Sequence, residues 1–231
     1  MTLLKNSLAL LGLGLLALAG CNGPRPPEVV VVGGFGAIDL DGEGDFPDDP
    51  IIDTPRFSGR IGVGFEGHAA DTDGYGSGPR LGGRFNFSYT RESFDDRSVA
   101  GEPFLEIEDY VDLSLFTPQV IVSYRQVFAG DADFGGWYVE PGVGVGPTIG
   151  TIGFGSTLEF GDSPVATDLD DTETEVGFGV NPFARIGYDT GSVLFGAEGG
   201  YLWTNLNFDD DLGRDPSEWY VGFHLGIKIG R

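Results

Sequence analysis

The stretch S-E-W-Y-V-G-F-H-L-G-I-K-I-G-R, residues 217–231, alternates between two kinds of side chain. Every odd position from Trp219 to Ile229 is apolar, and every even position from Glu218 to Gly230 is polar, charged or glycine. Successive side chains of a β-strand point to opposite faces, so the segment predicts a strand with one apolar face. If the pattern recurs around a closed sheet with no helices to cover it, that face is predicted to contact lipid.

The same alternation recurs along the chain. It predicts six further strands, at residues 56–67, 80–91, 110–127, 137–149, 175–188 and 193–203. In the strand at 110–127 we expect Val111, Leu113 and Leu115 to face outward. A bulge near Thr117-Pro118 would then change the phase.

An even strand number returns both termini to the same side of the membrane, so an eighth strand is expected. Residues 29–38, V-V-V-V-G-G-F-G-A-I, supply it; the alternative divides residues 138–160 into two strands at Gly150. With the first choice, long acidic connections alternate with shorter ones, except that the connection at residues 68–79 is longer than a tight turn. We expect external loops at residues 39–55, 92–109, 161–174 and 207–216.

The N-terminus carries the features of an export signal. Lys5 precedes an apolar run at residues 8–18 that is short for a membrane span. The sequence Leu18-Ala19-Gly20-Cys21 resembles a bacterial lipobox, which implies that Cys21 is lipidated; cleavage after Ala19 is the alternative. By the same resemblance, Asn22 favours transfer to the outer membrane. The predicted organisation is a signal peptide at 1–20, a lipidated, proline-rich tether at 21–28 and a β-barrel at 29–231.

The chain has a formal net charge of −23, which excludes nucleic acid as a partner and disfavours direct ion pairs with anionic lipid head groups. A saline habitat would also explain such an acidic surface. Two acidic segments resemble weak calcium sites, because alternating carboxylates near a glycine can surround a hard cation. Neither has the full twelve-residue spacing, and no other cofactor is expected. Their candidate ligands are Asp39, Asp41, Glu43, Asp45, Asp71 and Asp73.

The polar face of the strands carries charges that a barrel would enclose. Eight strands leave a narrow interior filled by side chains, and buried charges need partners, so we expect a network of ion pairs. Such a network is either a static polar plug or a gate that rearranges to admit ions. The expected members are Arg60, Glu66, Arg84, Arg125, Glu140, Arg185, Glu198, His224 and Lys228.

Catalysis is not expected. His68 and His224 are the only histidines, neither lies in a His-x-Ser arrangement, and the chain contains no Gly-x-Ser-x-Gly motif.

The strand pattern and the export signal resemble the small outer-membrane barrels of the OmpA, OmpX and OmpW type over residues 29–231. The resemblance implies an all-β, antiparallel, up-and-down transmembrane barrel of eight strands in the outer membrane of a Gram-negative cell. It also implies outer-membrane lipids and the barrel assembly machinery as partners. The chain departs from this family by ending in Ile229-Gly230-Arg231, where the family ends on an aromatic residue.

Three functions are open at this point. The first is a structural or surface-interaction role with acidic loops displayed outward, and the external ligand is not identified. The second is a gated narrow channel for ions or small solutes. The third is a periplasm-facing lipoprotein whose soluble barrel holds an apolar ligand inside.

Overall fold

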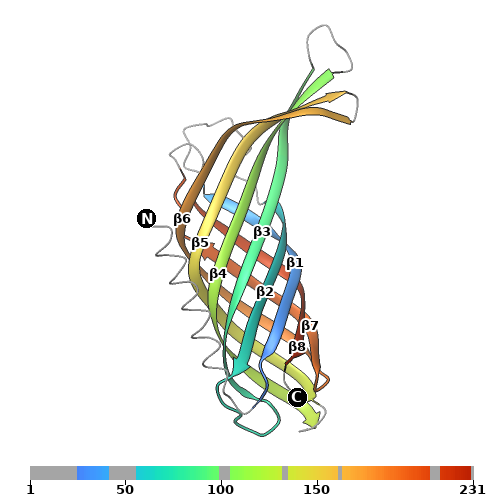
Figure 1. The fold of residues 1–231 in the computed structure, drawn as a ribbon, viewed down its shortest axis with the longest axis vertical. Coiled ribbons are helices and arrows are strands. Elements are labelled where there is room, and N and C mark those ends of the chain that lie inside the picture. The colour runs from blue at the N-terminus through green and yellow to red at the C-terminus, as the bar shows by residue number, and fades with distance from the viewer. Residues whose placement is uncertain are drawn as a thin grey trace.

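In the computed structural model the chain forms one closed antiparallel barrel in which each strand pairs with its neighbours in sequence and β1 pairs with β8 (Figure 1). The structure describes residues 25–41, 56–98, 105–131, 135–160, 163–208 and 214–229. The strands are β1 (Glu28–Asp41), β2 (Arg56–His68), β3 (Gly78–Ser98), β4 (Leu105–Asp131), β5 (Gly135–Phe160), β6 (Ser163–Asp189), β7 (Val193–Thr204) and β8 (Arg214–Lys228).

The predicted fold class is confirmed: the molecule is an all-β, up-and-down barrel of eight strands. The segment at residues 29–38 lies within β1. This strand begins one residue before the predicted start of the barrel, because Glu28 already pairs with Glu66 and Lys228. The alternative division at Gly150 is wrong, since β5 runs through that residue and pairs on both sides of it.

The described residues contain no helix that is long and apolar enough to cross a membrane.

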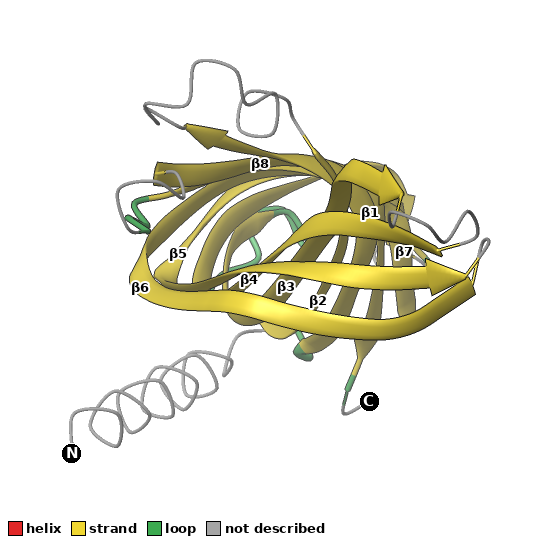
Figure 2. Ribbon diagram, turned by 90° about the horizontal axis from the view of Figure 1, so that it is seen from above, coloured by secondary structure: helices red, strands yellow, loops and turns green. Residues whose placement is uncertain are grey.

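The two faces of the sheet differ in chemistry, as the alternation predicts. Seen from above, the strands form a ring around a lumen (Figure 2). In β2 the side chains of Phe57, Ile61, Val63 and Phe65 are exposed on the outside, while the even-numbered residues between them are buried. Large apolar residues are exposed in the same way on all eight strands, among them Phe35, Phe85, Val122, Trp137, Ile186, Phe195 and Phe223.

Because the apolar face points outward and the lumen holds charged side chains, the soluble barrel with an apolar interior is wrong. An outer surface of this kind has no partner in water, whereas lipid chains match it. Aromatic residues that the alternation places outside, Tyr89, Trp137, Trp203 and Trp219, are all exposed, and Trp137 and Trp203 lie near strand ends. Tyr110 differs: it is buried, and the Arg91 guanidinium lies 3.6 Å from its ring centre.

In β4 the predicted change of phase is wrong. Val111, Leu113 and Leu115 are buried in the lumen, and the pairing with β3 runs through Thr117 and Pro118 without a register shift. Apolar residues therefore occupy both faces of the upper part of β4. The sequence alone favours a bulge there because it contains no sign that one end of the lumen is itself apolar.

Two of the four predicted external loops are largely strand. β3 and β4 pair up to Ser98 and Glu106, and β4, β5 and β6 pair up to Leu105, Phe160 and Ser163. These four strands rise past the ends of their neighbours at the top of Figure 1. Acidic residues directly opposite one another, such as Asp95 and Asp109, disfavour pairing in a sequence-based prediction. Much of the other two predicted loops lies outside the described residues.

The outward position of the tryptophans gives a direct test of the barrel's orientation toward lipid. Fluorescence of Trp137, Trp203 and Trp219 in vesicles should be quenched by lipids brominated on their acyl chains and resist quenching by aqueous acrylamide, because all three side chains point out of the lumen, Trp137 and Trp203 near strand ends. Bromine near the head groups should quench more than bromine near the chain ends. Strong acrylamide quenching without a bromine effect would contradict this arrangement.

Candidate functional site

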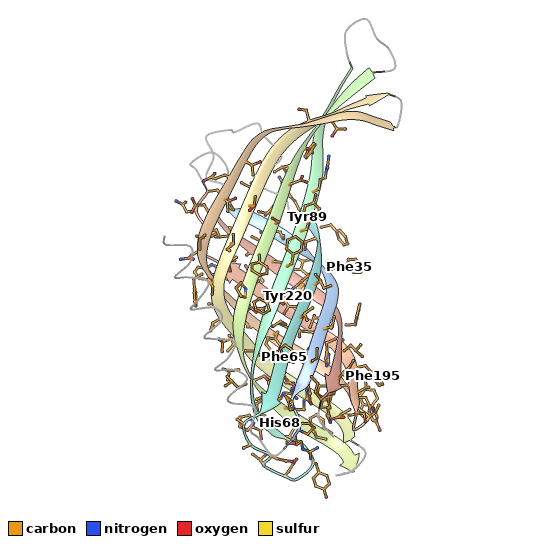
Figure 3. All side chains as sticks on the ribbon, viewed as in Figure 1. Phe35, Phe65, His68, Tyr89, Phe195 and Tyr220 are labelled. Carbon is orange, nitrogen blue, oxygen red and sulfur yellow. The ribbon has the colours of Figure 1, made fainter. Side chains whose placement is uncertain are left out.

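The lumen gathers the charged residues of the chain's polar strand faces. Figure 3 shows His68 at the lower end of this region and Tyr220 near mid-height. Of the nine residues that the sequence assigns to the lumen, eight are buried and Lys228 is partly buried. His224 is not part of an ion pair; its Nε2 makes a close hydrogen bond with the Tyr138 hydroxyl.

The lower half of the lumen holds a continuous chain of ion pairs. We call it the lower ion-pair network, formed by Glu28, Glu66, Arg80, Arg84, Arg125, Glu140, Arg185 and Glu198. Glu198 accepts from Arg84 Nη1 at 2.7 Å and from Arg185 Nε at 2.6 Å. Arg185 also donates to Glu66 and to Glu140, the latter at 3.0 Å.

The chain continues through the next guanidinium. Arg125 donates from Nε to Glu140 at 2.8 Å and from Nη1 to Glu28 at 3.1 Å, and Arg80 Nη2 donates to Glu28 at 2.6 Å. The eight side chains come from seven of the eight strands and carry four positive and four negative formal charges. Buried ions are tolerated when they are neutralised and hydrogen-bonded in this way.

Strand register explains part of this alternation. Arg185 lies directly opposite Glu140 on one side and Glu198 on the other. Opposite charges at such positions stabilise a sheet, and like charges do the reverse. Glu28 lies opposite Glu66, and the Arg80 guanidinium is within 4 Å of both carboxylates.

Glycines on the lumen side leave room for these long side chains. A Cβ on Gly82 would lie 2.6 Å from Glu66 Cγ, and a Cβ on Gly62 would lie 2.5 Å from Asn86 Oδ1. Any other residue at these positions would collide with the charged or polar groups opposite. At Gly62 the obstacle is a lumen side chain, and at Gly82 it is the Phe65 carbonyl of the neighbouring strand as well as Glu66.

Next to the network lies a polar layer, the mid-lumen layer, which shares Arg84 with it and is otherwise formed by Arg60, Asn86, Gln119, Asn181 and Tyr220. The Arg60 guanidinium lies over the Tyr220 ring, 4.1 Å from its centre, and donates from Nη1 to Glu218 in a short contact. Glu218 also accepts from Ser58 at 2.9 Å and from Ser88 at 2.7 Å. The Tyr220 hydroxyl donates to Glu198 at 3.0 Å and so connects this layer with the network below.

The upper end of the lumen is apolar. We call it the apolar cap: a cluster of eight buried residues, Ile38, Val111, Leu113, Leu115, Ile152, Leu202, Leu206 and Phe208. Leu206 and Phe208 follow β7 and fold into the barrel, where the Asn205 amide donates to the Phe178 carbonyl at 3.1 Å and Asp215 donates to Leu206 at 2.8 Å. The cap places a dry layer between the charges and the upper opening.

Several members of the lumen were not predicted. Arg80 and Glu218 are in phase with predicted members, Arg84 and His224, so the alternation was sufficient to find them. Glu28 was assigned to the tether because two prolines precede it. Asp189, which accepts from Lys228 Nζ at 2.6 Å at the lower end, carried no signal beyond its place in a short turn.

The candidate calcium ligands fall in two places. Asp39 is exposed, the side chain of Asp41 is not described, and Glu43 and Asp45 lie outside the described residues. Asp71 and Asp73 lie in the β2–β3 turn. Asp71 accepts from the Gly74 amide at 2.9 Å and from Arg25 Nε at 2.8 Å, and Asp73 accepts from the Tyr75 amide at 2.8 Å.

These hydrogen bonds settle the charge state of the turn. Desolvation raises the pKa of Asp73, but hydrogen bonds from Ser77 and from the amides of Tyr75 and Ser77 outweigh it and lower the pKa to about 2. Both carboxylates are used by the turn itself, and no group of three metal-ligating side chains occurs in the described part of the chain. Weak calcium binding stays a prediction.

No protein-family model matches the chain, and no curated protein matches it. The solved structures that resemble it include Ail, the attachment invasion locus protein of Yersinia pestis, crystallised in complex with the heparin analogue sucrose octasulfate. That match has 12% sequence identity, covers 88% of this chain and 99% of that chain, and has a TM-score of 0.46. Neisserial surface protein A matches with 13% identity over 88% of this chain and 97% of its own, with a TM-score of 0.43.

Arg185 tests the ion-pair network. Replacing Arg185 with Met should lower the free energy of unfolding by about 3–5 kcal/mol, because the carboxylates of Glu66, Glu140 and Glu198 lose a shared partner inside the lumen. Urea titration of the barrel in lipid vesicles measures this. The control is Arg91→Met, which loses a partly exposed pair with Asp112 at 3.9 Å and the contact with the Tyr110 ring, and should cost about 2 kcal/mol or less. Equal costs for the two variants would contradict a tightly coupled lumen.

Leu113 tests the apolar cap. Leu113→Ala should cost about 2–5 kcal/mol in the same assay, since it opens a cavity in a packed cluster. Val122→Ala, on the lipid-facing side of the same strand, should cost about 1 kcal/mol or less because lipid chains fill the space. The reverse order would place Leu113 on the lipid face.

Proposed function

We propose that the chain is an outer-membrane barrel with a structural and surface-interaction role, and that the paired upper ends of β3 to β6 are its interaction surface. One observation supports this most: four strands stay paired beyond the ends of their neighbours, with register shifts in the β3–β4 and β5–β6 pairs, and their sequence there is rich in acidic residues. The eight strands close the barrel below this extension, so the additional pairing of β3 to β6 is not needed to hold the barrel together.

The proposed orientation has the lower end in the periplasm. β1 begins and β8 ends there, and the β6–β7 turn, Asp189 to Val193, is short. Arg25 is held at this end by Asp71 and by the Gly74 carbonyl at 2.8 Å. Four residues extend at most about 14 Å, so a lipid on Cys21 would enter the inner leaflet beside the barrel rather than reach another membrane.

The upper sheet offers free edges of defined charge. The strand pairings give residues 163–171 of β6 partners only on β5, and residues 91–98 of β3 partners only on β4, among the described residues. In the strand register Asp96 lies opposite Glu108 and Asp95 opposite Asp109, and like charges at such positions disfavour one another. An edge of this kind suits an extended, positively charged segment of another protein, which would add a strand.

The gated channel comes second. Opening would require both the lower ion-pair network and the apolar cap to separate, and separating buried charges costs several kcal/mol for each pair.

A peptide-binding measurement tests the surface role. An immobilised peptide that alternates lysine and threonine should bind the detergent-solubilised barrel, and binding should weaken as salt rises, because the attraction is between exposed charges. Asp96→Asn with Glu108→Gln should weaken binding about ten-fold. Asp48→Asn with Asp49→Asn, which removes the same charge from the β1–β2 connection, is the control and should have a much smaller effect.

Equal losses in the two double variants would mean that net charge, not the sheet, attracts the peptide. Equal binding of a serine–threonine peptide would contradict the proposal altogether.

A further inference from the structure

We propose that the mid-lumen layer is a binding site for one small oxyanion, such as sulfate, phosphate or a carboxylate, held by Arg60 and Arg84. This site includes no residue of the acidic upper sheet. The inference starts from the hydrogen bonds that this buried layer leaves unmade.

Within the described structure, Arg60 and Arg84 each donate hydrogen bonds through only one of their three guanidinium nitrogens, Nη1. Arg60 reaches Glu218 through Nη1, and Arg84 reaches both oxygens of Glu198 through Nη1, at 2.8 and 2.7 Å. In both residues Nε and Nη2 are buried and have no partner among the described residues. These two nitrogens form the side-on fork with which arginine binds an oxyanion through two parallel hydrogen bonds.

The carboxylates already present do not need these forks. Glu218 is satisfied by Ser58, Ser88 and Arg60 Nη1. Glu198 accepts from Tyr220 and Arg185 in addition to Arg84. Leaving a charged donor unpaired in a buried site is costly, so a separate acceptor is required.

Gln119 adds a third donor. It lies directly opposite Arg84 on β4, its Oε1 accepts from Asn86 Nδ2 at 2.9 Å, and its Nε2 has no partner among the described residues. Both guanidinium groups are linked to Tyr220: that of Arg60 covers its ring, and that of Arg84 shares the Glu198 carboxylate with its hydroxyl. Other buried nitrogens without a partner in the described part of the chain, His68 Nδ1, Arg80 Nε and His224 Nδ1, are single atoms, whereas Arg60 and Arg84 each leave a whole fork unmade.

The balance of donors and acceptors favours an anion over water. Each water that accepts from these N–H groups brings two protons that need acceptors of their own. Among the buried side chains that the structure describes, Asn86 Oδ1 is the only oxygen left without a partner. An oxyanion accepts at several atoms and adds no protons, so one molecule satisfies the layer, and it shares the two guanidinium charges with Glu218 and Glu198.

By contrast, Arg125 in the lower ion-pair network has a hydrogen-bond partner for each of its three guanidinium nitrogens. This residue donates from Nε to Glu140 and from Nη1 and Nη2 to Glu28, so its fork is occupied. Arg125 therefore supplies a matched control in the same lumen.

The test is equilibrium dialysis with radiolabelled sulfate. The full chain is refolded into detergent in the presence of the tracer, at constant ionic strength set with chloride, so that a closed lumen does not hide the site. We expect saturable binding of one sulfate per barrel and a urea midpoint that rises with sulfate concentration.

The informative variants are Arg60→Lys and Arg84→Lys, which keep the charge that neutralises Glu218 and Glu198 but remove the fork. Each should weaken sulfate binding about ten-fold or more. Arg125→Lys should leave the sulfate affinity within about two-fold. Heat-dependent gel mobility verifies that each variant is folded, and either of the two site variants is sufficient if the other does not fold.

Two results would overturn the proposal. One is the absence of saturable sulfate and phosphate binding in the folded wild-type barrel, which would leave water as the occupant. The other is unchanged affinity in the folded Lys variants.

Discussion

Neutrality inside a narrow space is the constraint on which the rest of this structure depends. An eight-stranded barrel has an interior that side chains fill, and strand alternation sends every second residue into it. Arginine and glutamate occupy those positions here, so each charge must meet its opposite across the lumen. Arg185 contacts three carboxylates from three strands, and this one residue shows how the pairing fixes strand register as well as charge.

The same constraint explains the composition. Long charged side chains leave no space for methyl groups opposite them, which accounts for lumen glycines such as Gly62 and Gly82. The outer face is under no such restriction and carries large apolar and aromatic residues. The barrel is therefore inverted relative to a soluble protein, with its apolar surface outside, and lipid is the solvent that such a surface matches.

The outer face and the strand count were predictable from sequence, because period-two alternation is a local signal that persists over ten or more residues. The nine lumen residues proposed from it lie inside the barrel, with their partners set by register that no local pattern contains. β4 was misread where the cap begins: Leu113 looks lipid-facing because apolar residues are ordinarily on the outside of such barrels. The upper parts of β3 to β6 were read as loops because carboxylates such as Asp96 and Glu108 oppose pairing, and their pairing is decided by the whole sheet.

The central claim is that the folded chain is a lipid-embedded barrel held together from inside. Gel mobility of the protein from washed membranes, in SDS with and without boiling, tests it most directly. The account predicts a compact, faster-migrating form in the unboiled sample that converts on heating, since the closed sheet and its buried ion pairs resist SDS in the cold. A single mobility in both samples, together with release of the protein from membranes by urea, would contradict it.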